Sequence, residues 1–209
     1  MGRLTGMEAV QETPEKVLLM YEAVHRLVGE GVTLTDLKVS SITEQAGIGK
    51  GTAYEYFETK EELLACAFIF YVNRMAERIS LELEGLDSLR EQIDFIFEQL
   101  DQDSQRKYCF VRFVHAVTDD SRFSRLVRDK LTHNPEAQNF PEYLFGSIVQ
   151  QGVERGEING EIPPDYLIYS VFCKVLTYMM GICAEECFHT DVQRIRELVI
   201  EGILKDLKG

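Results

Sequence analysis

Apolar residues recur every three or four positions along most of the chain, a spacing that is typical of amphipathic helices. No alternating strand pattern of any length, no internal repeat and no low-complexity tract is present. The pattern predicts an all-α chain with three helices in an N-terminal domain and about six in the remainder. The later helices are expected at residues 89–100, 106–118, 123–131, 143–155, 166–187 and 191–207.

Capping residues predict where two of the earlier helices begin. Thr13 is expected to cap the first helix, with Pro14 at its first position, where proline is favoured. Thr59 and Glu62 form a capping box of the form T-x-x-E, which opens a long helix that should run to about residue 84. The residues expected to face inward along this long helix are Leu64, Phe68, Tyr71, Met75 and Ile79.

The stretch from Val39 to Leu64 predicts two short helices joined by a tight turn. Gly47 lies where a left-handed residue ends a helix, and Gly49 is suited to cap the next one. The second helix opens with residues 50–52, whose small or cationic side chains allow a close approach to another surface. The residues expected to anchor this helix to its own domain are Tyr54 and Phe57. This arrangement suggests a helix-turn-helix whose second helix enters a major groove.

The run AGIGKGTAYEYFETKEELL resembles the DNA-binding domain of the TetR family of bacterial transcription regulators, because many positions agree at fixed spacing. The resemblance implies a three-helix helix-turn-helix domain over residues 1–60 and a larger helical ligand-binding and dimerisation domain over residues 61–209. It also implies which residues contact DNA: Lys50, Gly51, Thr52, Tyr54, Tyr56 and Lys60.

These residues divide by the part of DNA that they are expected to contact. Residues 50–52 should approach base edges, whereas Tyr56 and Lys60 should hold the phosphate backbone. Glu55 lies in the same helix and would be repelled by phosphate. It either accepts a hydrogen bond from a cytosine amino group or points away from the bases.

The charge balance limits the kind of nucleic-acid contact. The 209 residues carry a formal net charge of -13, which argues against a broad nucleic-acid-binding surface. Residues 1–65 contain six Lys and Arg against eleven Asp and Glu, so the expected DNA-binding domain is itself acidic, at -5. A few well-placed cations can suffice, but non-specific affinity should be weak and sensitive to salt.

The cysteines and the N-terminus indicate a reducing compartment. Five cysteines, an odd number, and an N-terminus without a secretion signal favour free thiols and the cytoplasm. The spacing of Cys183, Cys187 and His189 matches no standard structural zinc site, so we expect reduced cysteines and no metal. The apolar stretch at residues 166–184 contains Lys174 at its centre, which favours a buried helix over a membrane span.

Polar residues on apolar helices are the candidates for an effector pocket. Arg112 and His115 are three apart on the expected central helix, and Tyr108 extends the same face. They are either the solvated face of a buried helix or anchors for a ligand's polar group. Lys174 is either a further anchor or an ion-pair partner across a dimer interface. Helix bundles commonly hold ligands in apolar cavities. The aromatic residues that either line such a cavity or fill the core are Phe95, Phe113 and Phe172.

Two functions remain open from the sequence. The first is a dimeric repressor that a small lipophilic effector releases from a palindromic double-stranded DNA operator. The second is a helical small-molecule-binding or interaction protein without useful DNA affinity, which the acidic N-terminal domain favours. Wide apolar stripes at residues 166–187 and 191–207 predict a homodimer interface. No Ser-His-Asp arrangement, glycine-rich phosphate loop or H-E-x-x-H motif supports an enzyme, and no cofactor is expected.

Overall fold

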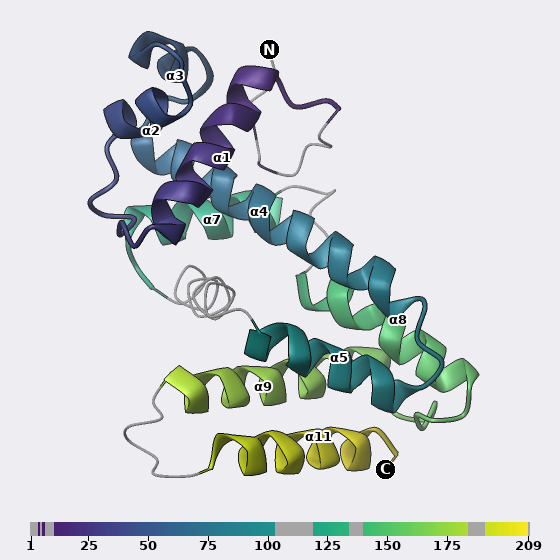
Figure 1. Ribbon diagram of the computed structural model, residues 1–209. Helices are drawn as coiled ribbons and strands as arrows, with labels where there is room; N and C mark the ends of the chain where they lie inside the picture. The colour runs from purple at the N-terminus through teal and green to yellow at the C-terminus, as the bar shows by residue number, and fades with distance from the viewer. Residues whose placement is uncertain are drawn as a thin grey trace. The chain divides into compact units, whose positions relative to one another are not determined.

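A computed structural model describes residues 4, 6, 11–102, 119–133, 140–183 and 191–208. Every regular element in these ranges is a helix, which confirms the expected all-α class (Figure 1). The chain divides into two compact units, of which the first holds Met1–Met75 and Phe113–Ala137 and the second holds Ala76–Arg112 and Gln138–Gly209. The expected helix at residues 106–118 lies outside the described residues.

The first unit is built around three short packed helices. They are α1 (Glu15–Gly29), α2 (Val39–Gln45) and α3 (Lys50–Tyr56), and each packs on the other two. The beginning of α4 (Lys60–Leu83) and the whole of α7 (Arg122–His133) belong to the same unit. Met20, Leu37 and Ile42 are fully buried at its centre. The ring of Tyr21 contacts Phe57 and Phe70, so aromatic side chains join α1 to the end of α3 and to α4.

Several helices begin one to three residues from the expected start, and α1 and α8 are two examples. Pro14, and not Thr13, is the N-cap of α1, and its carbonyl accepts the first backbone hydrogen bonds of the helix. Helix α8 begins at Phe140 and runs to Glu154, whereas the sequence placed its start at residue 143 or later. Pro141 lies in the first turn of α8, where a proline costs no helical hydrogen bond.

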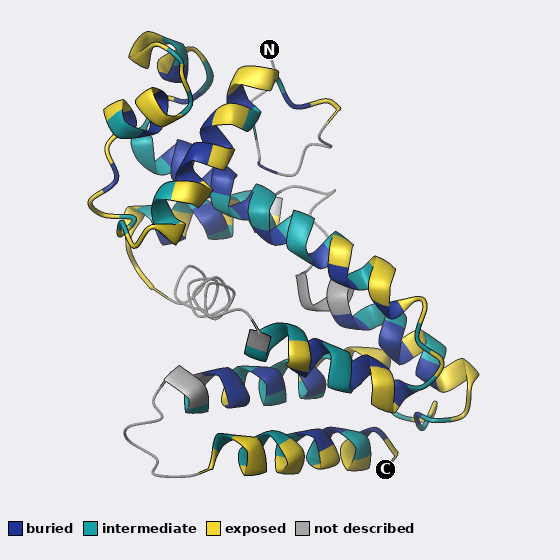
Figure 2. Ribbon diagram, viewed as in Figure 1, coloured by how far each residue is buried: buried dark blue, intermediate teal, exposed yellow. Residues whose placement is uncertain are grey.

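Helix α4 buries only part of the expected face. Ile69, Val72 and Ala76 are buried, together with Leu64 and Ile79. The expected inward residues Phe68, Tyr71 and Met75 are only half-buried (Figure 2). Phe68 packs edge-on against Phe123 of α7, and His25 of α1 stacks on Tyr71 with ring centroids 4.0 Å apart.

The second unit contains a ring of four helices. These are α5 (Leu89–Gln102), α8 (Phe140–Glu154), α9 (Pro164–Cys183) and α11 (Val192–Lys208), and each packs on two of the others (Figure 1). The large side chains of Phe97, Phe145 and Tyr178 are fully buried. The expected helices at 166–187 and 191–207 correspond to α9 and α11, although residues 184–190 lie outside the described part. None of the described helices is long and apolar enough to cross a membrane.

Candidate nucleic-acid interface

The turn between α2 and α3 has the backbone geometry that the glycines predicted. Gly47 has a φ of 68°, and its N–H donates to Glu44 O at 3.1 Å. The N–H of Ile48 donates to Thr43 O at 2.9 Å, so the last carbonyls of α2 are paired. Gly49 is the extended N-cap of α3, and its carbonyl accepts the N–H of Thr52. The expected roles of Gly47 and Gly49 are confirmed.

Helix α3 is anchored by Ala53 and by the residue that follows the helix, Phe57. Their side chains are 2% and 3% exposed. Tyr54 was also expected to anchor the helix, but its side chain is 52% exposed, so this prediction is wrong. With seven residues, α3 has only about two turns and one inward face, and the small Ala53 occupies it.

The outward face of α3 carries Gly51 and Glu55, which are four residues apart and both exposed. A Cβ atom added to Gly51 would meet nothing within 4 Å, so its backbone is open to a close approach. Lys50 and Tyr54 form an exposed pair beside this face, and Thr52 is half-buried on its other side. Glu55 therefore shares the exposed outward face of α3 with Gly51.

The two candidates for phosphate contacts lie at the end of α3 and the start of α4. Tyr56 and Lys60 are both half-buried. The ammonium group of Lys60 donates to Thr35 O at 3.1 Å, and two of its three N–H donors are left for other partners. Glu62 N–H donates to the Thr59 hydroxyl at 3.2 Å, as the capping box predicts. The Glu62 carboxylate accepts the N–H of Glu58 at 2.8 Å, one residue before the usual partner.

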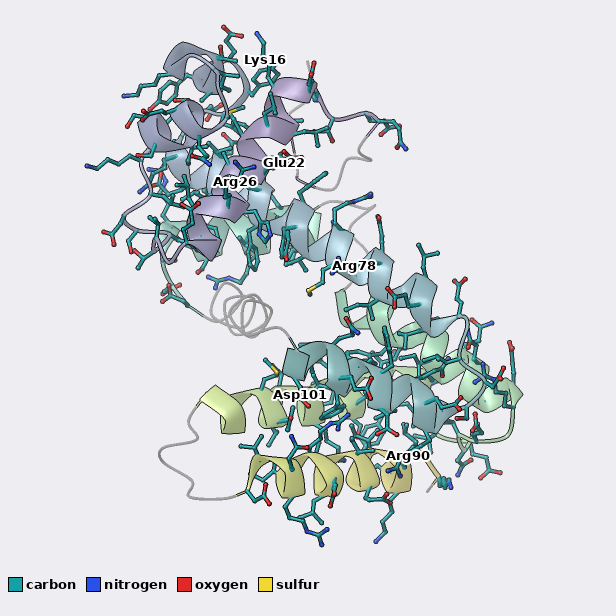
Figure 3. All side chains as sticks on the ribbon, viewed as in Figure 1. Lys16, Glu22, Arg26, Arg78, Arg90 and Asp101 are labelled. Carbon is teal, nitrogen blue, oxygen red and sulfur yellow. The ribbon has the colours of Figure 1, made fainter. Side chains whose placement is uncertain are left out.

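Charges of both signs alternate around this surface. Lys16, Glu22 and Arg26 are exposed along α1 (Figure 3), and Lys38 and Glu44 are exposed at the two ends of α2. The surface is therefore not a basic patch. Any DNA contact has to rest on individual side chains and on the shape of α3.

The candidate effector residues are only partly covered by the structure. Tyr108, Arg112, Phe113 and His115 lie outside the described residues, so their roles stay predictions. Lys174 of α9 forms an ion pair with Asp206 of α11 in the same chain, a partner that neither expected role included. The remaining two aromatic candidates, Phe95 and Phe172, are both half-buried. The ring of Phe172 packs against that of Phe145, with a centroid distance of 6.4 Å.

A buried polar cluster in the second unit was missed by the sequence reading. Tyr178, fully buried on α9, donates to the Asp101 carboxylate at 2.5 Å. Asp101 also pairs with Arg196 of α11 at 3.3 Å. Burial of Tyr178, followed by its hydrogen bond to Asp101, raises the pKa of this phenol above its ordinary value. A signal was present, because Arg90, Asp94 and Asp101 recur at helical spacing on α5, and all three interact with α11.

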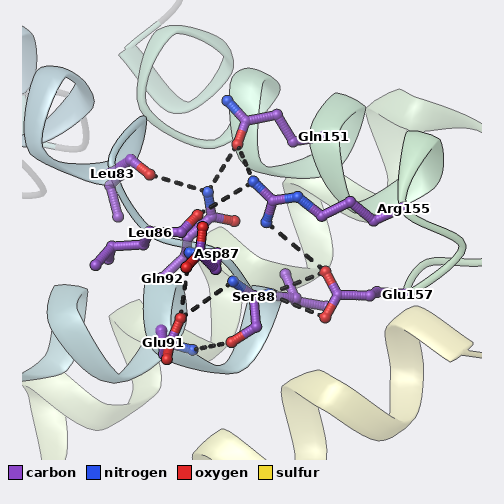
Figure 4. Close-up of polar contacts among 10 residues, drawn as sticks. Leu83, Leu86, Asp87, Ser88, Glu91, Gln92, Gln151, Arg155 and Glu157 are labelled. Atoms are coloured by element: carbon purple, nitrogen blue, oxygen red, sulfur yellow. Dashed lines mark hydrogen bonds and ion pairs between the residues drawn. The ribbon is translucent and has the colours of Figure 1, made fainter.

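A second polar network lies where α5 begins (Figure 4). Gln92 is fully buried, and its amide donates to Leu83 O at 3.1 Å and to the Gln151 side chain at 2.9 Å. The Glu157 carboxylate accepts the N–H of Leu89, the first residue of α5. A surface groove of about 860 Å³ lies beside this network, and charged side chains of both signs line much of it. Its lining differs from that of the expected apolar pocket.

Comparisons with known proteins identify the first unit. Residues 34–66 match the family model described as bacterial regulatory proteins, tetR family. A comparison with curated proteins found no match. The family match confirms the resemblance seen in the sequence and supports a DNA-binding transcription regulator over an enzyme.

Solved structures share the fold over nearly the whole chain. A Rhodococcus protein assigned to the TetR family has a TM-score of 0.64 at 18% identity, with 93% of this chain and 99% of that one covered. The transcriptional regulator FadR from Bacillus subtilis, solved with stearoyl-CoA, has a TM-score of 0.62 at 19% identity, with 90% of this chain and 97% of that one covered. RolR, solved with resorcinol, has a TM-score of 0.55 at 17% identity, with 96% of this chain and 91% of that one covered. At these identities the likeness establishes the fold.

Proposed function

We propose that this chain, which belongs to the TetR family by residues 34–66 and by its fold, is a ligand-responsive repressor of transcription that binds a palindromic operator. The observation that carries the proposal is the matched segment itself. It forms two helices joined by a glycine turn and leaves the outward face of α3 open at Gly51. A helix whose exposed face has open space at a glycine suits insertion into a major groove.

Particular residues of the matched segment are proposed to make the DNA contacts. Lys50, Gly51, Thr52 and Tyr54 would approach base edges. Tyr56 and Lys60 would hold phosphates, and Lys60 can do so without releasing Thr35 because an ammonium group has three donors. The acidic character of the domain implies that affinity for unrelated DNA is low.

We propose a homodimer through residues 166–187 and 191–207, which include α9 and α11. Large apolar side chains are exposed on both helices, namely Tyr166, Tyr169 and Leu198, at 58%, 65% and 56%. A partner subunit on this face would bury Leu198. A two-fold dimer would present two copies of α3 to the two halves of a palindrome. Sedimentation that shows a monomer at micromolar concentration would contradict this arrangement.

The effector is proposed to be a small lipophilic molecule held between helices of the ligand-binding domain expected over residues 61–209. Two proteins of similar fold were solved with stearoyl-CoA and with resorcinol, which supports a ligand with an apolar part. Arg112 and His115 remain the proposed anchors for a carboxylate or another polar group. The ligand can release DNA only by as much as it prefers the non-binding arrangement. Thermal stabilisation by fatty acids, acyl-CoA and aromatic acids would identify the class.

The decisive experiment selects binding sequences from a random double-stranded DNA pool and titrates them at two salt concentrations. Gly51→Leu should abolish specific binding while the protein stays folded, because the added side chain meets nothing in the free protein. Lys60→Ala should weaken binding to all sequences alike and lower the salt slope by about one per subunit. A folded dimer that selects no sequence at low salt would support the alternative, a small-molecule-binding or interaction protein without useful DNA affinity.

A further inference from the structure

Lys130 of α7 has an unusual position for a lysine. Its side chain is only 10% exposed, and its ammonium group lies 3.8 Å from the Glu62 carboxylate, whose side chain is 5% exposed. The same ammonium group donates to the backbone carbonyl of Leu4 at 2.7 Å. A buried lysine needs such partners, because leaving a charge without them inside a protein is costly.

The partner of Lys130 holds the junction between α3 and α4. One oxygen of Glu62 faces Lys130, and the other accepts the N–H of Glu58, which follows α3 directly after Phe57. The N–H of Glu62 itself donates to Thr59. The ion pair therefore connects α7 to the short link that fixes where α3 ends and where α4 begins.

Lys130 also binds the backbone at Leu4, which lies against α4. The carbonyl of Leu4 that binds Lys130 accepts a second hydrogen bond from the thiol of Cys66, at 3.4 Å. Gly6 is buried with a φ of 87°, and a Cβ atom added there would lie 2.3 Å from Cys66 O. The backbone at Gly6 thus approaches α4 more closely than a residue with a side chain would allow. Together, Leu4, Glu62, Cys66 and Lys130 form what we call the Lys130 cluster.

We infer that Lys130 is a positioning residue, through which α7 holds both the α3–α4 junction and the backbone at Leu4 in place for DNA binding. All parts of the cluster lie in the first unit, and Val127, one turn before Lys130, packs with Ala65 and Ile69 of α4. A shift of α7 along α4 would break both interactions of Lys130 at once and would separate the Lys130 ammonium group from the Glu62 carboxylate. The junction then loses its fixed geometry. The inference rests on the proposed function for its effect on DNA.

The test compares Lys130→Met with Lys16→Met, which removes the same charge from an exposed site of the same unit. Lys130→Met should raise the thiol reactivity of Cys66 on the order of tenfold, since the Leu4 backbone that binds this thiol is released locally. This is measured after the other four cysteines are replaced by Ser. Amide exchange at Glu58 should accelerate, and affinity for the selected operator should fall on the order of tenfold. Lys130→Arg should keep the thiol reactivity, the amide exchange and the operator affinity near those of the parent. Lys16→Met should leave the thiol reactivity of Cys66 and the amide exchange of Glu58 unchanged.

A double variant separates positioning from general stability. Lys130→Met with Glu62→Gln removes both charges of the buried pair, and glutamine also serves in a capping box. Exchange at Glu58 and operator affinity should return toward the parent, while Cys66 stays reactive because Leu4 has lost its cation. If Lys130→Met leaves Glu58 exchange as slow as Lys16→Met does, the inference is overturned. It is also overturned if the junction loosens while operator affinity is unchanged. A parent protein without DNA affinity would refute the proposed function, and Glu58 exchange would still decide whether α7 holds the junction.

Discussion

The helix-turn-helix and the four-helix ring hold their polar groups in different ways. In α2 and its turn the hydrogen bonds are local: the Thr43 hydroxyl donates to Val39 O, and the turn at Gly47 closes over a few residues. In the ring they join distant parts of the chain, as from Gln92 to Gln151 and from Tyr178 to Asp101. Local bonds follow from residue types in one short window. The distant bonds exist only after the helices have packed, so they report tertiary structure.

The largest expected effect comes from opening the core of the four-helix ring. Phe97 is fully buried, and its ring lies 4.9 Å from that of Tyr178. Phe97→Ala should lower the free energy of unfolding by about 3–5 kcal/mol, measured by urea denaturation. Leu81, 69% exposed on α4, is the control, and Leu81→Ala should change stability by less than about 0.5 kcal/mol. If the two variants lost similar amounts of unfolding free energy, the stability of the four-helix ring would not depend on the packing of Phe97.

The next effect tests whether distant polar pairs stabilise the ring. Arg196 pairs with Asp101 and donates to Asp94 O, and its side chain is 21% exposed. Arg196→Met should cost about 1–3 kcal/mol, because Asp101 would keep Tyr178 but lose its cation. Arg194 is two residues away and pairs with Glu197, but both side chains are more than 60% exposed. Arg194→Met should change stability by less than about 0.5 kcal/mol. Equal losses would remove the distinction between buried and surface pairs.

Tyr178 gives the ring a specific dependence on alkaline pH. Its pKa is raised above the ordinary 10.0 by burial and by the Asp101 hydrogen bond, so the folded state keeps a proton that the unfolded state loses. This contribution is fully present below pH 10.0 and is lost as pH rises through the folded-state pKa, by about 1.4 kcal/mol per pH unit. Tyr178→Phe should flatten the fall in unfolding free energy above pH 10 by that amount. Parallel curves for parent and variant would contradict the assignment.

The smallest effects concern two glycines of the helix-turn-helix and should have opposite signs. Gly47 has a left-handed φ, so Gly47→Ala should destabilise the protein by about 1 kcal/mol. Gly51 lies inside α3 with an ordinary helical backbone and open space around it. Gly51→Ala should therefore stabilise the free protein by about 0.5–1 kcal/mol. Thermal unfolding of the two variants measures this difference, and two losses of the same size would show that backbone conformation is not the cause.

The parts of the structure that the sequence predicted are those that local chemistry determines. The starts of α3 and α4 follow from Gly49 and Thr59, each of which acts on its own neighbours. The buried face of α4 could not be chosen in the same way, because residues 63–72 are apolar on almost every side. Tyr178 appeared in the sequence only as one more aromatic residue, since its partner Asp101 is 77 positions away.

The candidate site shows the same division. The open position of Gly51 was foreseen from the motif, whereas the exposure of Tyr54 depends on how α3 rests on α1 and α2. The contacts of Lys60 with Thr35, of Lys174 with Asp206 and of Lys130 with Leu4 join separate elements. No periodicity of a single helix predicts such contacts.

The length of α3 limits how much sequence information one subunit can extract. Its seven residues rise about 10 Å, which spans about three base pairs at about 3.4 Å each. Because four kinds of base pair can be distinguished, each base pair that is read supplies about two bits of sequence information. One helix that reads three base pairs therefore collects about six bits, and its recognition sequence occurs by chance about once in 64 positions. A bacterial genome offers on the order of 10⁶ competing positions, which takes about 20 bits to resolve. Two helices in a two-fold dimer reach about 12 bits. The remaining information, about 8 of about 20 bits, has to come from half-site spacing, DNA shape or side chains outside α3. The number of operator positions that tolerate no substitution would measure this remaining contribution.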